Sequence, residues 1–375
     1  MVVEGPPDIN LFGGSACSPK CIRVGMDFAG LGTVYIAANK LARACNRKGS
    51  ALEMKHVFSC DKLRASKLLI HHHFPPGEWQ NDIKKRDVAN TPDCDVYSFT
   101  APCQAHSLLG KRKGFDDDAR SQLLIFALEY IETKKPKCVI SENVAQVKTD
   151  EKFMSLTIAV LTKNGYVFEF NDVNTHDYNV PQSRTRLYLI AIRQDCLRSK
   201  TCGVNWWPDP VPCTAPIRNF IRKLPDSEFQ MLPQHKLHHD NVTRAYEKVV
   251  QLGKNPFGET VIIDMKSSET FSGLTVGVSP TLTRTRCSGL GYWCSYKGGV
   301  LSIADMCALQ GFDADELDFA GCCVSDAAAG GLIGNAQSLN VVNAILPHML
   351  FLSQLITKKE FLVMKAFNKT EATRV

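Results

Sequence analysis

The chain of 375 residues lacks several features that would place it outside the ordinary globular proteins. No apolar run approaches the ~20 residues that a membrane-spanning helix needs. Residues 1–20 do not combine a basic start with an apolar core, so we expect no secretory signal. The composition is 44% hydrophobic and 22% charged, which excludes disorder, collagen and coiled coil as the main architecture.

A strong excess of one charge sign is also missing. The 44 basic residues outnumber the 38 acidic ones, giving a net charge of +6. This modest excess is compatible with an anionic partner and does not establish one. The length suits one large domain, or a domain with a smaller companion, at roughly 100–200 residues each. Such a chain can bury a core without a disulfide or metal staple.

Closely spaced metal-binding cysteines are absent, although the chain has 15 cysteines. No C-x-x-C pair occurs, and Cys17 and Cys21 are one residue further apart. The histidines within 235–239 follow Cys213 at no standard zinc spacing. We therefore predict no metal site, and reduced thiols in a reducing compartment.

What the chain does have is a regular alternation of strand-like and helix-like segments. The expected strands are 22–28, 55–59, 95–99, 137–140, 167–173 and 187–192, and the expected helices are 34–45, 63–70, 121–131 and 153–161. This alternation predicts an α/β fold with a doubly wound, mostly parallel sheet. The last two strands have no helix between them, so they should form an antiparallel hairpin at the sheet edge.

The texture of the sequence changes after residue 193. Residues 194–276 hold many prolines, ten basic and nine acidic side chains, and no strand–helix rhythm. We predict a small irregular domain here, inserted into a large domain formed by residues 1–193 and 277–375. Alternation resumes weakly after the insert, and residues 339–355 predict a long apolar helix.

A glycine-containing turn follows the first expected strand and opens a helix. Gly30 and Gly32 allow a tight turn and let a ligand approach the helix N-terminus. Tyr35 stands where the dinucleotide fingerprint needs a third glycine, which favours a smaller nucleoside ligand. Asp61 ends the second strand, where it can accept from ribose hydroxyls, and Asp82 follows the next helix, near an adenine amine. A plain strand-to-helix turn is an equally good interpretation of this segment alone.

Three polar motifs flank later strands of the predicted sheet: two follow a strand at the same sheet edge, and the third leads into the strand at 187–192. Cys103 comes after the strand at 95–99, where a thiolate can act as a nucleophile on a bound ligand. Glu142 closes the next strand and can accept from an exocyclic amine or donate to a ring nitrogen. Arg184 and Arg186 share one strand face and suit a base carbonyl or a phosphate. The plainer interpretations are an ordinary thiol, a helix-terminal carboxylate and solvated edge charges.

The order of the motifs is more specific than any one of them. The chain carries a glycine loop at 27–33, Pro-Cys-Gln at 102–104, Glu-Asn-Val at 142–144, Gln-x-Arg-x-Arg at 182–186 and Gly-Asn at 334–335. This ordered set resembles the signature of the cytosine-5 DNA methyltransferases, over residues 22–355. The resemblance implies a Rossmann-like methyltransferase sheet, with residues 194–276 as the target-recognition domain.

The resemblance also implies a role for each matching residue. For the cofactor S-adenosylmethionine, Phe28, Gly30 and Gly32 would form the cradle. Asp61 would contact the ribose and Asp82 the adenine, and Asn335 would close the pocket from the C-terminal side. Cys103 would attack carbon 6 of cytosine while Glu142 holds the N3 edge. Arg186 would contact O2, with support from Arg184. Carbon 5 would take the methyl group, and loss of its proton and of the thiol would complete the reaction.

The implied substrate is double-stranded DNA with the target cytosine flipped out of the stack. The predicted nucleic-acid contacts are Gln104, Lys111, Arg112, Lys113, Gln182 and Thr281. The basic run among them also suits plain solvated charges, because three aspartates follow at 116–118. We predict a monomer without membrane or metal partners. It would lie inside the cell, in the nucleus of a eukaryote or in the cytoplasm or nucleoid of a bacterium.

Two other interpretations stay open. The first is the tRNA-directed branch of the same family, which typically carries Pro-Pro-Cys, whereas Ala101 precedes Pro102 here. The second is a non-catalytic DNA-binding regulator with the same fold. The chain departs from the family pattern at Asp61, where Glu is usual, and in Gly334-Asn-Ala-Gln-Ser338 instead of Gly-Asn-Ser. Neither departure touches the reacting residues.

Overall fold

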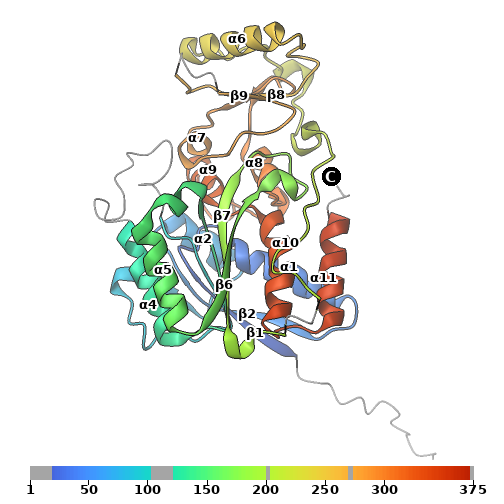
Figure 1. Cartoon of the computed structure of the whole chain (residues 1–375). Coiled ribbons are helices and arrows are strands. Elements are labelled where there is room, and N and C mark those ends of the chain that lie inside the picture. The colour runs from blue at the N-terminus through green and yellow to red at the C-terminus, as the bar shows by residue number, and fades with distance from the viewer. Residues whose placement is uncertain (1–18, 103–120, 200–202, 269–272, 372–375) are drawn as a thin grey trace, which may run out of the picture.

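A seven-stranded sheet forms the centre of the computed structural model, which describes residues 19–102, 121–199, 203–268 and 273–371 (Figure 1). Its strands are β1 Lys20–Asp27, β2 Leu52–Cys60, β3 Glu78–Gln80, β4 Val96–Phe99, β5 Cys138–Val144, β6 Tyr166–Asn174 and β7 Thr185–Arg193. They lie in the order β3-β2-β1-β4-β5-β7-β6. Strands β1 to β5 are parallel, whereas β7 is antiparallel to both of its neighbours. The predicted doubly wound sheet and its edge hairpin are confirmed.

Helices cover both faces of this sheet. The longer helices of the chain are α1 Thr33–Asn46, α2 Arg64–His73, α4 Leu124–Lys134, α5 Glu151–Lys163, α6 Lys236–Gln251, α9 Asp326–Asn335, α10 Leu339–Leu352 and α11 Lys358–Glu371, and the shorter ones are α7 Arg284–Ser288 and α8 Ile303–Leu309. Helices α1, α10 and α11 pack together, and α4 packs against α5. Strand residues alternate between the two cores, so that Ile140 belongs to the α1–α10 side and Val139 to the α4–α5 side.

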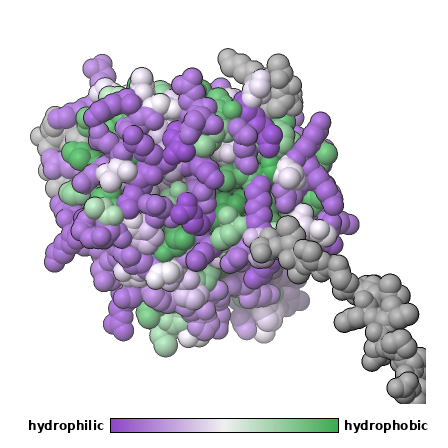
Figure 2. All heavy atoms as spheres, turned by 90° about the horizontal axis from the view of Figure 1, so that it is seen from below, coloured by the Kyte–Doolittle hydropathy of each residue, from purple (hydrophilic) through white to green (hydrophobic). Residues whose placement is uncertain are grey.

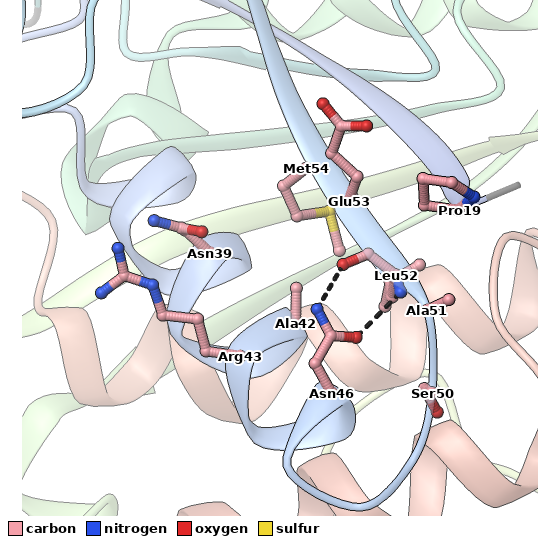
Figure 3. Close-up of a pocket in the computed structure, with 10 residues that line it drawn as sticks. All are labelled: Pro19, Asn39, Ala42, Arg43, Asn46, Ser50, Ala51, Leu52, Glu53 and Met54. Carbon is pink, nitrogen blue, oxygen red and sulfur yellow. Dashed lines mark hydrogen bonds between the residues drawn. The ribbon is translucent and has the colours of Figure 1, made fainter. Parts of the chain in front are cut away.

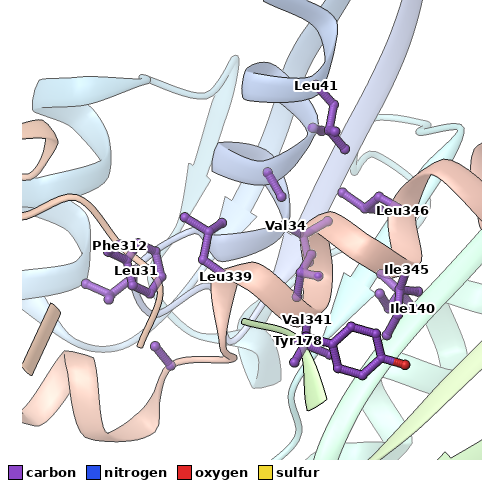
Figure 4. Packing of buried hydrophobic residues seen from close by; sticks show 14 of the residues in the cluster. Leu31, Val34, Leu41, Ile140, Tyr178, Phe312, Leu339, Val341, Ile345 and Leu346 are labelled. Carbon is purple, nitrogen blue, oxygen red and sulfur yellow. The ribbon is translucent and has the colours of Figure 1, made fainter. Parts of the chain in front are cut away.

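The larger core lies between α1, α10 and the sheet (Figure 4). Leu31, Val34 and Leu41 meet Leu339 and neighbouring residues of α10 there. Because α10 comes from the far end of the chain, this packing joins the C-terminal segment to the first strand–helix unit. The core therefore fixes the end of β1 relative to the turn that precedes α10.

A second, antiparallel sheet stands apart from the large one (top of Figure 1). Its strands, in the order β11-β10-β8-β9, are β8 Val261–Asp264, β9 Leu274–Val276, β10 Tyr292–Cys294 and β11 Gly299–Val300. Helix α6 packs on it, and the two elements share a core around Val242, Val249, Ile263 and Trp293. The region is more regular than its prolines suggested. Its strands were not predicted because strands of two to four residues are too short to show a hydrophobic period. Its strands lie on both sides of the predicted boundary at 276.

The lower end of the molecule, where β1 and β2 begin, is mainly hydrophilic with separate apolar residues (Figure 2). A hollow there is lined by side chains that include Asn39, Arg43 and Glu53 (Figure 3). The Asn46 side chain closes its floor with hydrogen bonds of 2.8 Å to both backbone groups of Leu52. Ligands of open α/β sheets bind at the opposite, carboxyl ends of the strands, so this hollow is not the predicted site.

The described residues show the state of the cysteines and whether any helix could cross a membrane. All twelve cysteines within them are free thiols, and eight of these are buried. None of the helices in the described ranges combines the length and apolarity that crossing a membrane requires.

Candidate active site

The glycine turn between β1 and α1 has the strained backbone that its sequence predicts. Gly30 and Gly32 have φ of 54° and 76°, and Phe28 before them has φ of 55°. A Cβ atom on Gly32 would lie 2.6 Å from the ring of Phe74, so only glycine fits there. The Asp61 carboxylate accepts hydrogen bonds from the N–H of Gly30 at 2.9 Å and of Leu63 at 2.8 Å. Asp61 thus stabilises the turn, in addition to the ribose contact that was predicted for it.

A small hollow opens above this turn. The residues that line it come from the end of β1 and the turn, from β4 and from the connection between α9 and α10: Met26 to Leu31, Thr33, Val34, Ser98, Thr100, Asn335, Ala336 and Gln337. The structure therefore brings predicted Asn335 next to predicted Phe28 and Gly30, although about 300 residues separate them in sequence. Asn335 is exposed.

Polar groups without partners face this hollow. The Gln337 side chain is 4% exposed, and its Nε2 atom has no hydrogen-bond partner among the described residues. Within that same part of the chain, the first turn of α1 has no side-chain cap and no acidic residue. Buried donors of this kind are costly unless a ligand or water satisfies them. The hollow therefore suits a ligand with acceptor groups.

Asp82 has a different environment from the other predicted cofactor residues. It caps the short 3₁₀ helix η1 Ile83–Lys85 by accepting from the Lys84 N–H at 3.1 Å, and its carboxylate lies 3.1 Å from the Lys62 ammonium. Partial burial raises the pKa of Asp82, but the Lys84 N–H and Lys62 together bring that pKa below its ordinary value. Asp82 is thus a charged group at the rim of the β3 side of the sheet.

Buried Asp27 and Arg86 form an ion pair beneath the glycine turn that sequence reasoning missed. Both side chains are fully buried, and Arg86 Nη1 lies 2.6 Å from a carboxylate oxygen of Asp27. The Tyr97 hydroxyl also donates to Asp27, and Arg86 donates to the carbonyl of Phe126 in α4 at 2.7 Å. The pair joins the cofactor side of the sheet to α4. The 59 residues between its partners explain why no local pattern revealed it.

Glu142 lies at the end of β5 between the two predicted arginines. Its Oε1 atom is 3.2 Å from Arg186 Nε and 3.9 Å from Arg184 Nη2. The pairing of Val144 with Arg186 across β5 and β7 makes Glu142 and Arg186 diagonal neighbours on one sheet face. The side chains of Glu142 and Arg184 are only 7% and 3% exposed, whereas that of Arg186 is 16% exposed. Arg186 is thus the more accessible of the two arginines.

Burial controls the protonation of this cluster. It raises the pKa of Glu142, against the smaller lowering effects of Arg184 and Arg186. It also lowers the pKa of Arg184 to about 10. A carboxyl group whose pKa is raised can hold a proton at a higher pH than usual, and can then donate it to a ring nitrogen.

Arg184 and Gln182 hold the site together from behind. Arg184 donates to the carbonyls of Leu282 at 2.7 Å and Ala336 at 2.9 Å, which ties β7 to the wall of the hollow. The Gln182 side chain is 0% exposed, donates to the carbonyl of Leu309 and accepts from Leu282 N–H at 3.2 Å. Gln182 was predicted to contact DNA; its complete burial in internal hydrogen bonds gives it a structural role instead. Predicted Thr281 is more accessible, although its hydroxyl donates to the carbonyl of Ser183.

The predicted nucleophile lies just outside the described residues. Cys103, Gln104, Lys111, Arg112 and Lys113 all fall in the undescribed range 103–120. The chain leading to them is placed: Asn143 donates to the carbonyl of Ala101 at 3.3 Å. Phe99 and Ser141 are paired in register, so β4 and β5 end at the same edge of the sheet. Residue 102 is therefore held close to the strand end that carries Glu142.

Comparison with known proteins identifies the family of the chain. Residues 28–350 match the sequence profile of the C-5 cytosine-specific DNA methylases. The chain belongs to this family. Its members are enzymes that methylate cytosine in DNA, which confirms the predicted family and reaction class.

Relatives among characterised proteins are bacterial and phage methyltransferases. The type II methyltransferase M.DsaV of Dactylococcopsis salina is 25% identical over 338 residues, covering 89% of this chain and 88% of that protein. M.HhaI of Haemophilus parahaemolyticus is 30% identical over 180 residues, covering 46% of this chain and 53% of the relative. The orphan methyltransferase M.SPRI of Bacillus phage SPR is 29% identical over 187 residues, covering 49% and 41%. The last two alignments span about half of each relative or less.

Solved structures share the fold. S. pombe Dnmt2 methyltransferase superposes with a TM-score of 0.59 at 17% identity, covering 90% of this chain and all of that one. The Entamoeba histolytica methyltransferase EhMeth gives a TM-score of 0.62 at 15% identity, with 90% and 100% coverage. At such low identity these likenesses show the fold alone.

Proposed function

We propose that this protein transfers a methyl group from S-adenosylmethionine to carbon 5 of cytosine in DNA. The observation that carries the proposal is Glu142, buried between Arg184 and Arg186 at the strand edge that also holds the glycine turn. The family match over residues 28–350 also supports the proposal.

The hollow above the glycine turn has the donors and acceptors that S-adenosylmethionine requires. The buried amide of Gln337 and the uncapped N-terminus of α1 can serve its carboxylate or hydroxyl oxygens. Asp61 and Asp82, which do not line the hollow itself, would supply acceptors for its ribose and adenine. When bound, S-adenosylmethionine would supply an electrophilic methyl group. The residues of the hollow would hold and orient it.

The chain's own residues would activate the base. Carbon 6 of cytosine is a poor electrophile, so Cys103 can attack it only while the ring is polarised. Glu142, with its raised pKa, would donate a proton to N3 as the Cys103 sulfur bonds to carbon 6. Arg186 would hold O2, and Arg184 would position both side chains. After carbon 5 is methylated, loss of its proton and departure of the Cys103 thiolate would restore the aromatic ring.

Double-stranded DNA would need to change shape to reach the site, and the second lobe would help to recognise it. A stacked cytosine cannot reach Glu142, so the target base of double-stranded DNA would be flipped out at a cost of a few kcal/mol. Residues 194–276, with the sheet on which α6 packs, would read the neighbouring bases. We propose that the protein acts as a monomer. We also propose that it acts inside the cell, because its DNA substrate lies there.

Methyl transfer from labelled S-adenosylmethionine to DNA and to tRNA, measured in parallel, tests the proposal. We expect labelled DNA from the parent protein and none from Cys103→Ala. A Cys103→Ala protein that methylates DNA as well as its parent would rule out the mechanism. Label on tRNA alone would identify the tRNA-directed branch of the family. A folded parent that neither transfers methyl groups nor binds S-adenosylmethionine would favour a DNA-binding regulator.

A further inference from the structure

Two histidines and a cysteine converge away from Glu142, on the outer side of α2. His72 and His73 end α2, and Cys322 lies in the turn that precedes α9. The possible ligand atoms of these three side chains all lie within 4.8 Å of one another. We propose that His72, His73 and Cys322 form a binding site for a transition-metal ion of Zn²⁺ type. This proposal departs from the expectation of no metal site, which was drawn from local cysteine and histidine spacing.

The turn around Cys322 is built to aim the thiol at the histidines. The Asp318 carboxylate accepts from the N–H of Gly321 at 2.7 Å, which closes the turn. Cys323 follows in a left-handed conformation, with φ of 56°. This backbone leaves Cys323 exposed while Cys322 is 6% exposed, with its sulfur 3.8 Å from His73 Nε2. Adjacent cysteines therefore face opposite ways, and one of them faces the histidines.

The His73 Nε2 atom accepts a hydrogen bond from the N–H of Asp318 at 3.1 Å. A metal ion at Nε2 would replace this hydrogen bond, because each imidazole nitrogen has a single in-plane lone pair. A neutral imidazole is the form that ligates metals. His72 is exposed and gives an ion a path from solvent.

The donor set selects the class of ion. Two imidazoles and one thiolate favour Zn²⁺, Co²⁺ or copper over Mg²⁺ and Ca²⁺, which prefer oxygen ligands. Three protein ligands leave a fourth tetrahedral position for water. On binding, the Cys322 thiol would lose its proton to solvent and the sulfur would bond to the metal, with no change of oxidation state.

The position of the site suggests what a bound ion would do. Helix α2 starts beside Leu63 and Asp61, which hold the glycine turn, and α9 ends at Asn335 on the other wall of the same hollow. A metal that links the end of α2 to the turn before α9 would fasten these two walls together. It would thus stabilise the fold from a point outside the hollow itself.

Cobalt titration of the full-length, tag-free, reduced protein tests the site. We expect one equivalent of Co²⁺ to give tetrahedral ligand-field bands and a thiolate-to-cobalt charge-transfer band that added Zn²⁺ abolishes. Cys322→Ser should lose the charge-transfer band, and His73→Ala should bind Co²⁺ at least ~10-fold more weakly. Zn²⁺ should raise the Tm of the parent and leave that of Cys322→Ser unchanged.

Two neighbouring substitutions serve as matched controls. Cys323→Ser removes the adjacent, exposed thiol, and His71→Ala removes the third histidine of the run, which lies against Trp79. Both should keep the charge-transfer band and the parent's affinity. Binding without a thiolate band, or equal losses in the controls and in the ligand variants, would overturn the proposal. These readouts do not depend on methyl transfer, so they stand apart from the test of the proposed function.

Discussion

At the scale of single residues, Glu142 has the environment of a proton donor. Two arginines lie beside it, yet burial prevails and raises its pKa above the ordinary value of 4.5. Between 4.5 and the higher pKa of the folded state, the folded protein therefore holds more protons than the unfolded chain. Stability must fall as pH rises through this window, because ionising Glu142 in the folded protein costs free energy.

This reasoning predicts how Glu142→Gln changes the pH dependence of stability. The variant cannot ionise at this position, so its stability should gain on that of the parent as pH rises from about 4.5, and the gain should level off above the folded-state pKa. Denaturant midpoints measured from pH 4 to pH 8 provide the test. Glu132→Gln, which alters a solvent-exposed pair with Lys163, should show no such gain. Parallel curves for Glu142→Gln and its parent would contradict the assignment.

Gln337 is the other residue whose environment asks for a partner. Its buried Nε2 atom has none among the described residues, so an apolar side chain of equal length should cost the ligand-free protein nothing. We expect Gln337→Met to keep or raise the Tm of the ligand-free protein. It should also weaken S-adenosylmethionine binding roughly 2- to 13-fold, the worth of one hydrogen bond. Calorimetry with S-adenosylmethionine measures the affinity, with Gln251→Met on α6 as the control. A lower Tm with unchanged affinity would show that the amide has an internal role.

At the scale of elements, regular strands and helices were predictable and short ones were not. The hairpin of β6 and β7 followed from two apolar runs without a helix between them. The three-residue strand β3 and the small second sheet have too few residues to show a period, so tertiary packing alone defines them. The order of motifs likewise placed Glu142 and Arg186 together, whereas the roles of Gln182 and Asp27 depended on partners 59 to 127 residues away.

The turn that starts α1 allows a prediction at this scale. Gly32→Ala places a Cβ in a left-handed backbone, which costs roughly 1–2 kcal/mol, and also 2.6 Å from the Phe74 ring. Phe74 packs against Tyr35, so it cannot yield freely. Gly165→Ala, with φ of 73° and nothing within 4 Å, pays only the backbone cost. Unfolding free energies should therefore fall further for Gly32→Ala, by about 1–3 kcal/mol. Equal losses in both variants would mean that the ring moves aside.

At the scale of the whole molecule, the chain has separate hydrophobic cores. The large sheet has one on each face, and one face of the small sheet shares another with α6. The other face of the small sheet, with Ile262, Tyr292 and Cys294, belongs to the larger core. The sequence indicated a second lobe through its prolines and its loss of rhythm, but residues 292–300 of the small sheet belong to a stretch that was predicted to be part of the large domain. A strand that returns to a sheet after 28 residues leaves no local mark, so a boundary drawn from composition alone cannot include it.

The core between α6 and the small sheet predicts a local stability of its own, which Val249→Ala can reveal. Val249 is 0% exposed in the small core, and losing its two methyl groups should cost about 2 kcal/mol. If the small lobe opens on its own, its amides in α6, β8 and β10 should exchange with solvent at least ~10-fold faster, while those of β1 and β4 keep their rates. Val250→Ala, on the same helix but 60% exposed, should change neither set. A uniform acceleration in Val249→Ala would show instead that both lobes unfold as one cooperative unit, and that the second lobe depends on the large sheet for its stability.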